Sequence, residues 1–466
     1  MTHSDEIEVD LQSIGHVHLL GIGGIGVSAV ARLLLARGLV VSGSDVRESA
    51  ITLALREEGA RVTIGHHPDN PAGADLVVVS TAIPASNPEL VAARGAGLPV
   101  VHRSRVLGAL MEGHRSLGVT GTNGKGTVSA LTAWLLEAAG RDPSFAIGGL
   151  LLNFGTNARQ AVGRHLVCEL DESDGSFTNT RSVRLVINNL EADHLNFYRD
   201  LDGLLARFSD YLTSAMAPEH LHVNGDDHNI RRVLQAARRD SVTYGEGPDC
   251  RYRVTGFEPR KMGSRFRLRG PGGDLGQFHM EVPGRYNAMN AAAALSVVLE
   301  EGVDVEQVRE ALPAFKGMEN RFTVVEAGGC TVVKDYISHP TGIRSVIEAA
   351  RAFAPGRIVA VFKPYRFTMI HYLQDEYRTA FTGTDLTLVT ETYTAGEVPL
   401  IGVDDDFLVE KIRSSGSDVV YVPVMEDITR VLQERVRAND TVVFFGGDDL
   451  FAVADAFAAQ LDKGKP

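Results

Sequence analysis

The sequence predicts an α/β protein of three domains, Rossmann-like at both ends and with a mostly parallel sheet in the middle. Three observations predict this fold class. The 466 residues are too many for one core of ordinary size. Short apolar runs alternate with helical patterns along most of the chain, which is typical of parallel sheets covered by helices. Two of the turns that lead from a strand into a helix are rich in glycine, as in nucleotide-binding folds.

Composition narrows the class of protein. The hydrophobic fraction of 44% and the charged fraction of 23% are typical of ordered globular chains. A net charge of −13 would repel a nucleic acid, so we expect none as a partner. No apolar run reaches the roughly 20 residues needed to cross a bilayer, so we expect no membrane insertion. Cys168, Cys250 and Cys330 show no disulfide or zinc spacing, which favours the cytoplasm.

The first expected domain, residues 1–107, begins with the strand HVHLL at 16–20 and the loop GIGGIG at 21–26. A helix follows, and then a second strand that ends at Asp45. Glycine lets a pyrophosphate approach the backbone at the start of a helix, and an acidic residue at the next strand can bind a ribose hydroxyl. The expected ligand-binding residues are Gly21, Gly23, Gly24, Gly26 and Asp45. By itself the loop leaves open NAD, another nucleotide, or simple packing of a helix on glycine.

The second expected domain, residues 108–322, contains the strand SLGVT at 116–120 and the loop GTNGKGT. In such a loop the backbone N–H groups hold phosphates and the lysine neutralises the terminal phosphate. The loop therefore predicts a P-loop ATPase domain that binds ATP. Its residues are Gly121, Thr122, Asn123, Gly124, Lys125, Gly126 and Thr127. Gly126 stands where a P-loop usually has the Ser or Thr that binds Mg²⁺, so the hydroxyl must come from Thr127 or elsewhere.

Two further residues are candidates for a magnesium site. Glu169 lies near the end of a predicted strand at 165–170, and His194 follows the next strand. The carboxyl ends of parallel strands meet at one edge of a sheet, so both side chains could reach the phosphates. Carboxylate is a natural Mg²⁺ ligand and histidine a less usual one.

The third expected domain, residues 323–466, has apolar strands at 330–337, 357–365, 385–393, 418–424 and 441–447. The other histidines considered, which are His66, His67, His102 and His114, show no metal-ligand spacing. We expect them at the surface or in turns. Trp134 is expected to pack a helix.

Eight segments occur in the order found in the Mur ligase family, which the chain resembles from about His16 to Leu450. They are GIGGIG, GTNGKGT, CELDESDGSF, NNLEADHLNFY, PGRYNAMNA, FKGMENRF, DYISHPTGI and AGEVPLIG. The first and third are similar to the branch that adds L-alanine. The resemblance implies an ATP-dependent, ADP-forming amide ligase of peptidoglycan precursor synthesis, which joins an amino acid, with L-alanine favoured, to the carboxylate of UDP-N-acetylmuramate. It also implies that GIGGIG holds a UDP-linked sugar acid rather than NAD.

The resemblance further implies roles for individual residues. Lys125 would neutralise the γ-phosphate of ATP, and Thr127, Glu169 and His194 would bind Mg²⁺. Asn287 and Arg321 match positions around ATP, and Asp335, Tyr336 and His339 match the segment that closes over it. Arg366 and Lys363 lie where the carboxylate of the amino acid is expected. A monomer or weak homodimer is expected.

The chain also departs from the family. Asn123 and Gly126 replace a His and a Thr, and Met369 replaces a second arginine near Arg366. These changes leave open a different amino acid or carboxylate donor. A catalytically inactive nucleotide-binding relative and an NAD-dependent oxidoreductase are the alternatives from other classes, and the joint presence of Lys125, Glu169 and His194 favours the ligase over the inactive relative.

Overall fold

The computed structural model describes residues 8–463, and it consists of two compact units. Unit 1 comprises the chain up to Leu190 together with Leu205–Tyr244 and Ala293–Ala311. Unit 2 comprises Glu191–Leu204, Gly245–Ala292 and the chain from Leu312 onward. Each unit is described by itself. No helix within residues 8–463 is both long and apolar enough to cross a bilayer.

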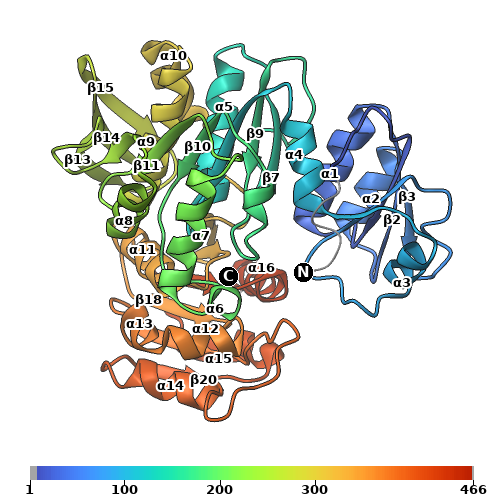
Figure 1. The fold of residues 1–466 in the computed structure, drawn as a ribbon. Coiled ribbons are helices and arrows are strands. Elements are labelled where there is room, and N and C mark those ends of the chain that lie inside the picture. The colour runs from blue at the N-terminus through green and yellow to red at the C-terminus, as the bar shows by residue number, and fades with distance from the viewer. Residues whose placement is uncertain (1–7, 464–466) are drawn as a thin grey trace. The chain divides into compact units, whose positions relative to one another are not determined.

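Unit 1 begins with a five-stranded sheet in the order β3-β2-β1-β4-β5, in which all neighbouring strands are parallel. Its strands are β1 (His16–Leu20), β2 (Val40–Asp45), β3 (Arg61–Ile64), β4 (Leu76–Val79) and β5 (Val100–His102). Its helices are α1 (Ile25–Ala36), α2 (Ala50–Glu57), α3 (Pro88–Gly95) and α4 (Arg103–Met111). Figure 1 labels β2, β3 and the helices α1 to α4 of this blue part of the chain. The connection from β1 goes first to β2 and later returns to β4 on the other side. Ligands of open α/β sheets bind at such a reversal, beyond the carboxyl ends of the strands.

The first sheet separates two layers of helices. α1 contacts both α2 and α4, whereas Leu90 and Ala93 of α3 pack against Leu20 and Val77. Side chains alternate along a strand, so His18 faces α3 together with Leu20, while Val17 and Leu19 face the opposite way. This alternation places polar residues of β1 and β2 under α3.

The second sheet of unit 1 has the order β12-β11-β10-β6-β9-β7-β8, and only β7 and β8 are antiparallel. Its strands are β6 (Arg115–Thr120), β7 (Ser144–Leu151), β8 (Thr156–Arg159), β9 (His165–Glu169), β10 (Arg184–Ile187), β11 (His220–Asn224) and β12 (Val242–Gly245). The accompanying helices are α5 (Lys125–Ala138), α7 (Leu201–Thr213), α8 (His228–Ala237), α9 (Arg285–Glu300) and α10 (Val305–Ala311), of which α7 and α9 begin in unit 2. β6 is central, so the loop that follows it opens at the carboxyl edge of the sheet. Trp134 of α5 packs as expected and donates to the carbonyl of Ala311.

Unit 2 contains an antiparallel meander and a third α/β sheet. The meander consists of β13 (Tyr252–Arg260), β14 (Gly263–Gly270) and β15 (Gly273–Met280). The sheet has the order β16-β17-β21-β18-β19-β20 and is parallel except for β16. Its strands are β16 (Thr323–Ala327), β17 (Cys330–Asp335), β18 (Ile358–Phe362), β19 (Leu386–Val389), β20 (Val419–Tyr421) and β21 (Thr441–Phe445). Its helices are α6 (Leu195–Tyr198), α11 (Pro340–Arg351), α12 (Phe367–Tyr372), α13 (Gln374–Ala380), α14 (Asp405–Arg413), α15 (Met425–Arg435) and α16 (Asp448–Lys463).

The fully apolar strands of unit 2 explain its two-sided core. Ile358, Ala360 and Phe362 of β18 pack into one cluster, and Val359 and Val361 pack into another. A parallel strand covered by helices on both faces needs apolar residues at every position. The predicted fold class, α/β with mostly parallel sheets, is confirmed. The expected domain limits stay a prediction: residue 107 lies within α4, and residue 322 directly precedes β16.

Candidate functional site

The loop after β1 has the closed geometry of an anion-binding turn. The Gly24 N–H donates to the carbonyl of Gly21 at 2.9 Å, and the Gly23 N–H donates to Oδ2 of Asp45 at 2.9 Å. No side chain caps the start of α1, so its first N–H groups are open to a ligand. The sequence predicts that the carboxylate of Asp45 binds a ribose hydroxyl. In the structure this carboxylate also holds the loop in shape, through its hydrogen bond with Gly23.

Arg103 lies directly against this loop. A Cβ atom at Gly26 would come within 3.0 Å of Nη1 of Arg103, so a side chain at that position would displace the guanidinium. Nη2 of Arg103 also forms an ion pair with Oδ2 of Asp171 at 2.8 Å. Asp171 belongs to the DESDGSF segment that follows β9, so Arg103 connects the first glycine loop with the central sheet.

The second glycine loop, which follows β6, is held by two asparagines at the end of β10. Thr122 N–H donates to the carbonyl of Asn189, and Asn123 N–H donates to its Oδ1 at 2.7 Å. The side-chain amides of Asn188 and Asn189 donate in return to the carbonyl of Asn123. Gly121 has φ +122°, and a Cβ there would lie 2.7 Å from the carbonyl oxygen of Asn189. Asn188 and Asn189 were not among the expected residues, although they open the NNLEADH segment.

Lys125 starts α5 and is surrounded by carboxylates. Its Nζ donates to the carbonyls of Gly121 and Thr122 and pairs with both oxygens of Glu172 at 2.9 and 2.8 Å. Burial by itself would lower the pKa of Lys125, but Glu172, Asp171 and Glu169 outweigh it and raise the pKa above its usual value. Burial raises the pKa of Glu172 to about 8 despite the charge of Lys125, and Asp171 adds to the rise. The ammonium is therefore charged, and the site holds more acidic groups than cations.

This excess of acidic groups fits a divalent cation. Glu169 ends β9 and accepts from the Gly148 N–H at 2.8 Å, which leaves its other oxygen available. Thr127 lies in the first turn of α5, one residue beyond Gly126. These oxygen donors suit Mg²⁺. Within residues 8–463, no three His, Cys, Asp or Glu side chains are gathered as a preformed metal site. Cys168, just before Glu169, is fully buried, and burial raises the pKa of its thiol.

In unit 2, three of the residues expected around ATP contact one another. Arg321 donates to the carbonyl of Tyr336 at 2.8 Å, lies over its ring at 5.8 Å, and approaches Oδ1 of Asp335 at 4.0 Å. Burial raises the pKa of Asp335 to about 6, although Arg321 and the Phe322 N–H oppose the rise. Asn287 is buried in α9 and donates to the carbonyl of Pro283.

A pocket of about 310 Å³, part of it open to solvent, lies in unit 2. Its lining includes Asp193, His194, Arg366, Met369 and Tyr372. Arg366 has an unusual φ of +63°, and its guanidinium lies over the ring of Tyr365 at 5.0 Å. The Nε atom of Arg366 is buried without a hydrogen-bond partner in the described chain. His339 begins α11 and lies 3.7 Å from the carboxylate of Glu191.

Lys363 is less available than expected. It is buried and forms an ion pair with Asp449 at the start of α16, and its Nζ lies 5.5 Å from the centre of the Tyr393 ring. An ammonium that already has a carboxylate partner is a weaker ligand for a second carboxylate. Arg366 is therefore the stronger candidate for binding a carboxylate.

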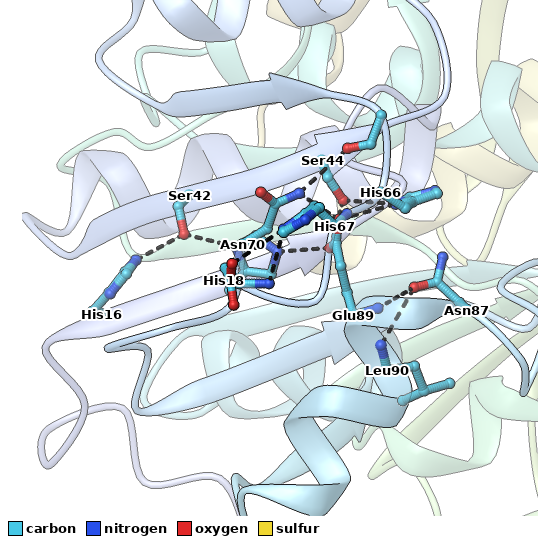
Figure 2. Close-up of polar contacts among 12 residues, drawn as sticks. His16, His18, Ser42, Ser44, His66, His67, Asn70, Asn87, Glu89 and Leu90 are labelled. Atoms are coloured by element: carbon cyan, nitrogen blue, oxygen red, sulfur yellow. Dashed lines mark hydrogen bonds and ion pairs between the residues drawn. The ribbon is translucent and has the colours of Figure 1, made fainter.

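His66, His67 and His114 lie in loops or turns, as expected, whereas His102 ends β5. His67 is exposed, but His66 donates to Glu89 beneath the first sheet, and His102 caps α4 and pairs with Asp174 at 3.4 Å. His114 is within 3.0 Å of Arg37. Figure 2 shows the surroundings of His66, in which the buried carboxylate of Glu89 faces several polar side chains. Its partners lie 19 to 71 residues away in sequence, so no local motif could have indicated them.

Comparisons with known proteins agree with this geometry. Three family models match in order: "Mur ligase family, catalytic domain" over residues 16–115, "Mur ligase middle domain" over 119–298, and "Mur ligase, glutamate ligase domain" over 320–447. A UDP-N-acetylmuramate--L-alanine ligase of Sorangium cellulosum is 38% identical over 460 residues, with 97% of this chain and 98% of the relative covered. One from Bradyrhizobium diazoefficiens is 36% identical over 466 residues, with the same coverage.

Among solved structures, the UDP-N-acetylmuramate-alanine ligase MurC of Thermotoga maritima matches with a TM-score of 0.81 and 26% identity. The match covers 97% of this chain and 100% of the other. A murein peptide ligase of Psychrobacter arcticus shares the fold, with a TM-score of 0.70 at 22% identity over 97% of this chain and 99% of the other.

Two glycine loops, one of them with a charged lysine, thus lie in an α/β chain whose relatives are ligases, and the chain is an ATP-dependent ligase. It belongs to the Mur ligase family. This membership favours a ligase over the NAD-dependent oxidoreductase that the first glycine loop alone had left open.

Proposed function

We propose that the chain joins L-alanine to the carboxylate of UDP-N-acetylmuramate while ATP is converted to ADP and phosphate. The observation that carries this proposal is the similarity, over 97% of the chain, to relatives with that name. The reaction would serve peptidoglycan precursor synthesis in the cytoplasm. A monomer or weak homodimer remains our expectation, which sedimentation velocity tests.

In the proposed reaction, the donor carboxylate attacks the γ-phosphorus of ATP, and the bond to ADP breaks. The amine of L-alanine then attacks the acyl carbon, loses a proton and displaces phosphate. Such phosphoryl transfer depends on positioning and charge neutralisation. Lys125 supplies a fixed positive charge to the γ-phosphate, and Arg366 binds the carboxylate of the amino acid. The residues proposed to contact ATP are Asn287, Arg321, Asp335 and Tyr336. His339 is proposed to belong to the same segment that closes over ATP.

Mg²⁺ is proposed as a cofactor, with Thr127, Glu169 and His194 as its protein ligands. When bound, it would neutralise charge on the phosphates. Glu169 contributes a carboxylate, and its negative charge is one of those that raise the pKa of Lys125. His194 belongs to unit 2, so its approach to the other two ligands is part of the proposal. Thr127→Ala tests whether that hydroxyl replaces the one absent at Gly126: the variant should need more Mg²⁺ for half-maximal activity.

The decisive experiment measures ADP and phosphate release by the purified chain. We expect release only when ATP, UDP-N-acetylmuramate and an amino acid are all present. Release of AMP, or an absorbance change with NAD(H) as the only nucleotide, would contradict the proposal.

One observation supports a second candidate, a ligase with another acceptor. Near Arg366 the pocket has Met369 and Tyr372, and Lys363 is paired with Asp449. The family pattern has a second arginine where this chain has Met369. Arg366 would therefore bind the carboxylate of the amino acid without a second guanidinium beside it. We expect L-alanine to be a poor or non-exclusive acceptor. A screen of amino acids by product mass tests this; strict and efficient use of L-alanine would exclude the second candidate.

A further inference from the structure

Glu89 is a buried acid to which the proposed reaction gives no role. It lies in the first turn of α3, and its side chain is 0% exposed. An ionised carboxylate so far from water must be compensated by hydrogen bonds and charge. Its partners therefore show what the residue holds in place.

Five hydrogen bonds converge on this carboxylate (Figure 2). Oε2 accepts from Nε2 of His18 at 3.0 Å and from Oγ of Ser44 at 2.7 Å. Oε1 accepts from Nδ1 of His66 at 3.2 Å, from the His67 N–H at 3.2 Å and from Nδ2 of Asn70 at 2.6 Å. A carboxylate can only accept, so it fits five donors at once. Glu89 thus joins β1 and β2 to the loop 65–70, which follows β3.

The loop 65–70 lies at the ligand-binding edge of the sheet. It continues from the carboxyl end of β3, and the Gly65 N–H donates to the carbonyl of Asp45 at 2.8 Å. Asp45 in turn accepts from Gly23 of the first glycine loop. A nucleotide whose diphosphate occupies that glycine loop therefore has its nucleoside near the neighbouring strand ends.

The ring of His66 is oriented by Glu89 and Ser44. Its Nδ1 lies 3.0 Å from Oγ of Ser44 as well as 3.2 Å from Glu89, and its side chain is 15% exposed. A carboxylate at Nδ1 fixes the proton on that nitrogen, which leaves Nε2 as an acceptor. Within residues 8–463, no hydrogen bond to Nε2 of His66 occurs. This nitrogen can therefore accept an O–H or N–H group of a nucleoside.

Glu89 also has partners that do not involve His66. Polar contacts run from the carbonyl of Gly73 through His16, Ser42 and His18 to Oε2 of Glu89. These contacts fix the carboxylate against β1 and β2, so that Oε1 is held facing the loop 65–70.

We propose that Glu89 is a positioning residue for the nucleoside half of the UDP-linked donor, acting through the loop 65–70 and through Nε2 of His66. The inference rests on the proposed function, because it takes the ligand of the first glycine loop to be a uridine diphosphate.

Calorimetric binding of UDP and of ADP to the full chain tests this. Glu89→Gln keeps the shape of the side chain but puts an amide among donors, so we expect UDP to bind at least tenfold more weakly and ADP to bind as before. His66→Ala should produce a similar loss for UDP, and the double variant should lose little more, since both changes remove the same contact. Glu301→Gln is the matched control, because Glu301 is an equally buried acid bonded to His165, Arg115 and Arg184 of the central sheet; its UDP affinity should be unchanged.

Unchanged UDP affinity in Glu89→Gln, an equal loss for ADP, or additive losses in the double variant would overturn the inference. If Glu89→Gln does not fold, His66→Ala alone decides, since His66 lies in a loop: unchanged binding of UDP and of uridine would then overturn it. A wild-type chain that binds ADP but not UDP would refute the proposed donor itself, and the inference with it.

Discussion

Lys125 is the residue that we propose to neutralise the γ-phosphate of ATP, and its surroundings hold its ammonium in one position. Its ammonium is bound by the carbonyls of Gly121 and Thr122 and by Glu172. The same groups that hold it in place must yield when a phosphate arrives, because Nζ has three protons to share. The ammonium stays protonated at neutral pH, since its pKa lies above the usual value.

We expect Lys125→Ala to lower kcat by about a hundredfold or more. The variant loses a fixed charge directed at the transferred phosphoryl group. Such a charge lowers the activation free energy by about 3 kcal/mol or more. Steady-state ADP release measures the effect. The control is Arg94→Ala, which removes an exposed cation of α3 and should leave kcat unchanged. Turnover near the wild-type value in Lys125→Ala would refute the assignment of the loop.

At the scale of elements, the central sheet has charged side chains at both ends of its strands. Lys125 lies at the carboxyl end, and a cluster around Glu301 lies at the amino end. The P-loop lies beyond the carboxyl end of β6, whereas Arg115, His165 and Arg184 start β6, β9 and β10 at the opposite edge. All three bond to Glu301, which follows α9 and is 0% exposed. This acid therefore fixes the ends of three strands against one helix.

Glu301→Gln should destabilise unit 1 by about 3–5 kcal/mol. Removing the charge of Glu301 leaves the buried guanidinium of Arg184 without its carboxylate partner. The measurement is urea denaturation monitored by circular dichroism. Glu58→Gln is the control, since Glu58 pairs with Arg32 nearer the surface and should cost about 1 kcal/mol or less. Equal stability of the two variants would show that the contacts of Glu301 contribute little.

Acid should weaken unit 1 through Glu89 and Glu301. Burial would raise the pKa of Glu89, but hydrogen bonds from His18, Ser44 and Asn70 lower it from 4.5 to about 2. Burial would likewise raise the pKa of Glu301, and bonds from His165, Arg115 and Arg184 lower it further. A pKa that is depressed in the folded state stabilises the fold above pH about 4.5, and this stability is lost as the pH falls toward 2. Melting temperatures measured from pH 6 to pH 3 should fall, and fall less steeply in Glu301→Gln; an identical slope would contradict the assignment.

At the scale of the whole molecule, one acidic segment contacts both glycine loops of unit 1. In the segment 171–174, Asp171 pairs with Arg103 beside the first glycine loop, and Glu172 pairs with Lys125 of the second. Asp174 accepts from Thr81 and lies 3.4 Å from His102. Burial would raise the pKa of Asp174, but hydrogen bonds from His102, Ser176 and Thr81 hold it well below its usual range.

The ion pair between Arg103 and Asp171 should couple the two loops. We expect Arg103→Met and Asp171→Asn each to raise the KM for UDP-N-acetylmuramate several-fold, and the double variant to do little worse than Arg103→Met. Arg94→Met is the control for the loss of a cation. Fully additive effects on KM would show that the two residues act separately.

The sequence predicted those features whose residues are close along the chain. Lys125 and the glycines share a short loop between a strand and a helix, so their neighbourhood was readable from spacing alone. Glu172, Asp449 and Glu89 could not be assigned, because their partners lie 47, 86 and up to 71 residues away. The carboxylate partners of His66 and His102 could not be predicted for the same reason: a histidine bonded to a distant carboxylate has no signature in its own segment. The role of His194 as a magnesium ligand stays a prediction.

The burial of Cys168 has a practical consequence for chemical labelling. This thiol adjoins Glu169 at the end of β9 and is closed off from solvent, and Cys330 is buried as well. Since the thiolate is the form that reacts, a raised pKa protects both from maleimides and mild oxidants. Only Cys250 is partly accessible, so replacing it by serine would give a background against which a fluorophore can be attached at one introduced cysteine. Any reaction of that background with maleimide would then report the opening of β9 or β17, the strands that carry Cys168 and Cys330.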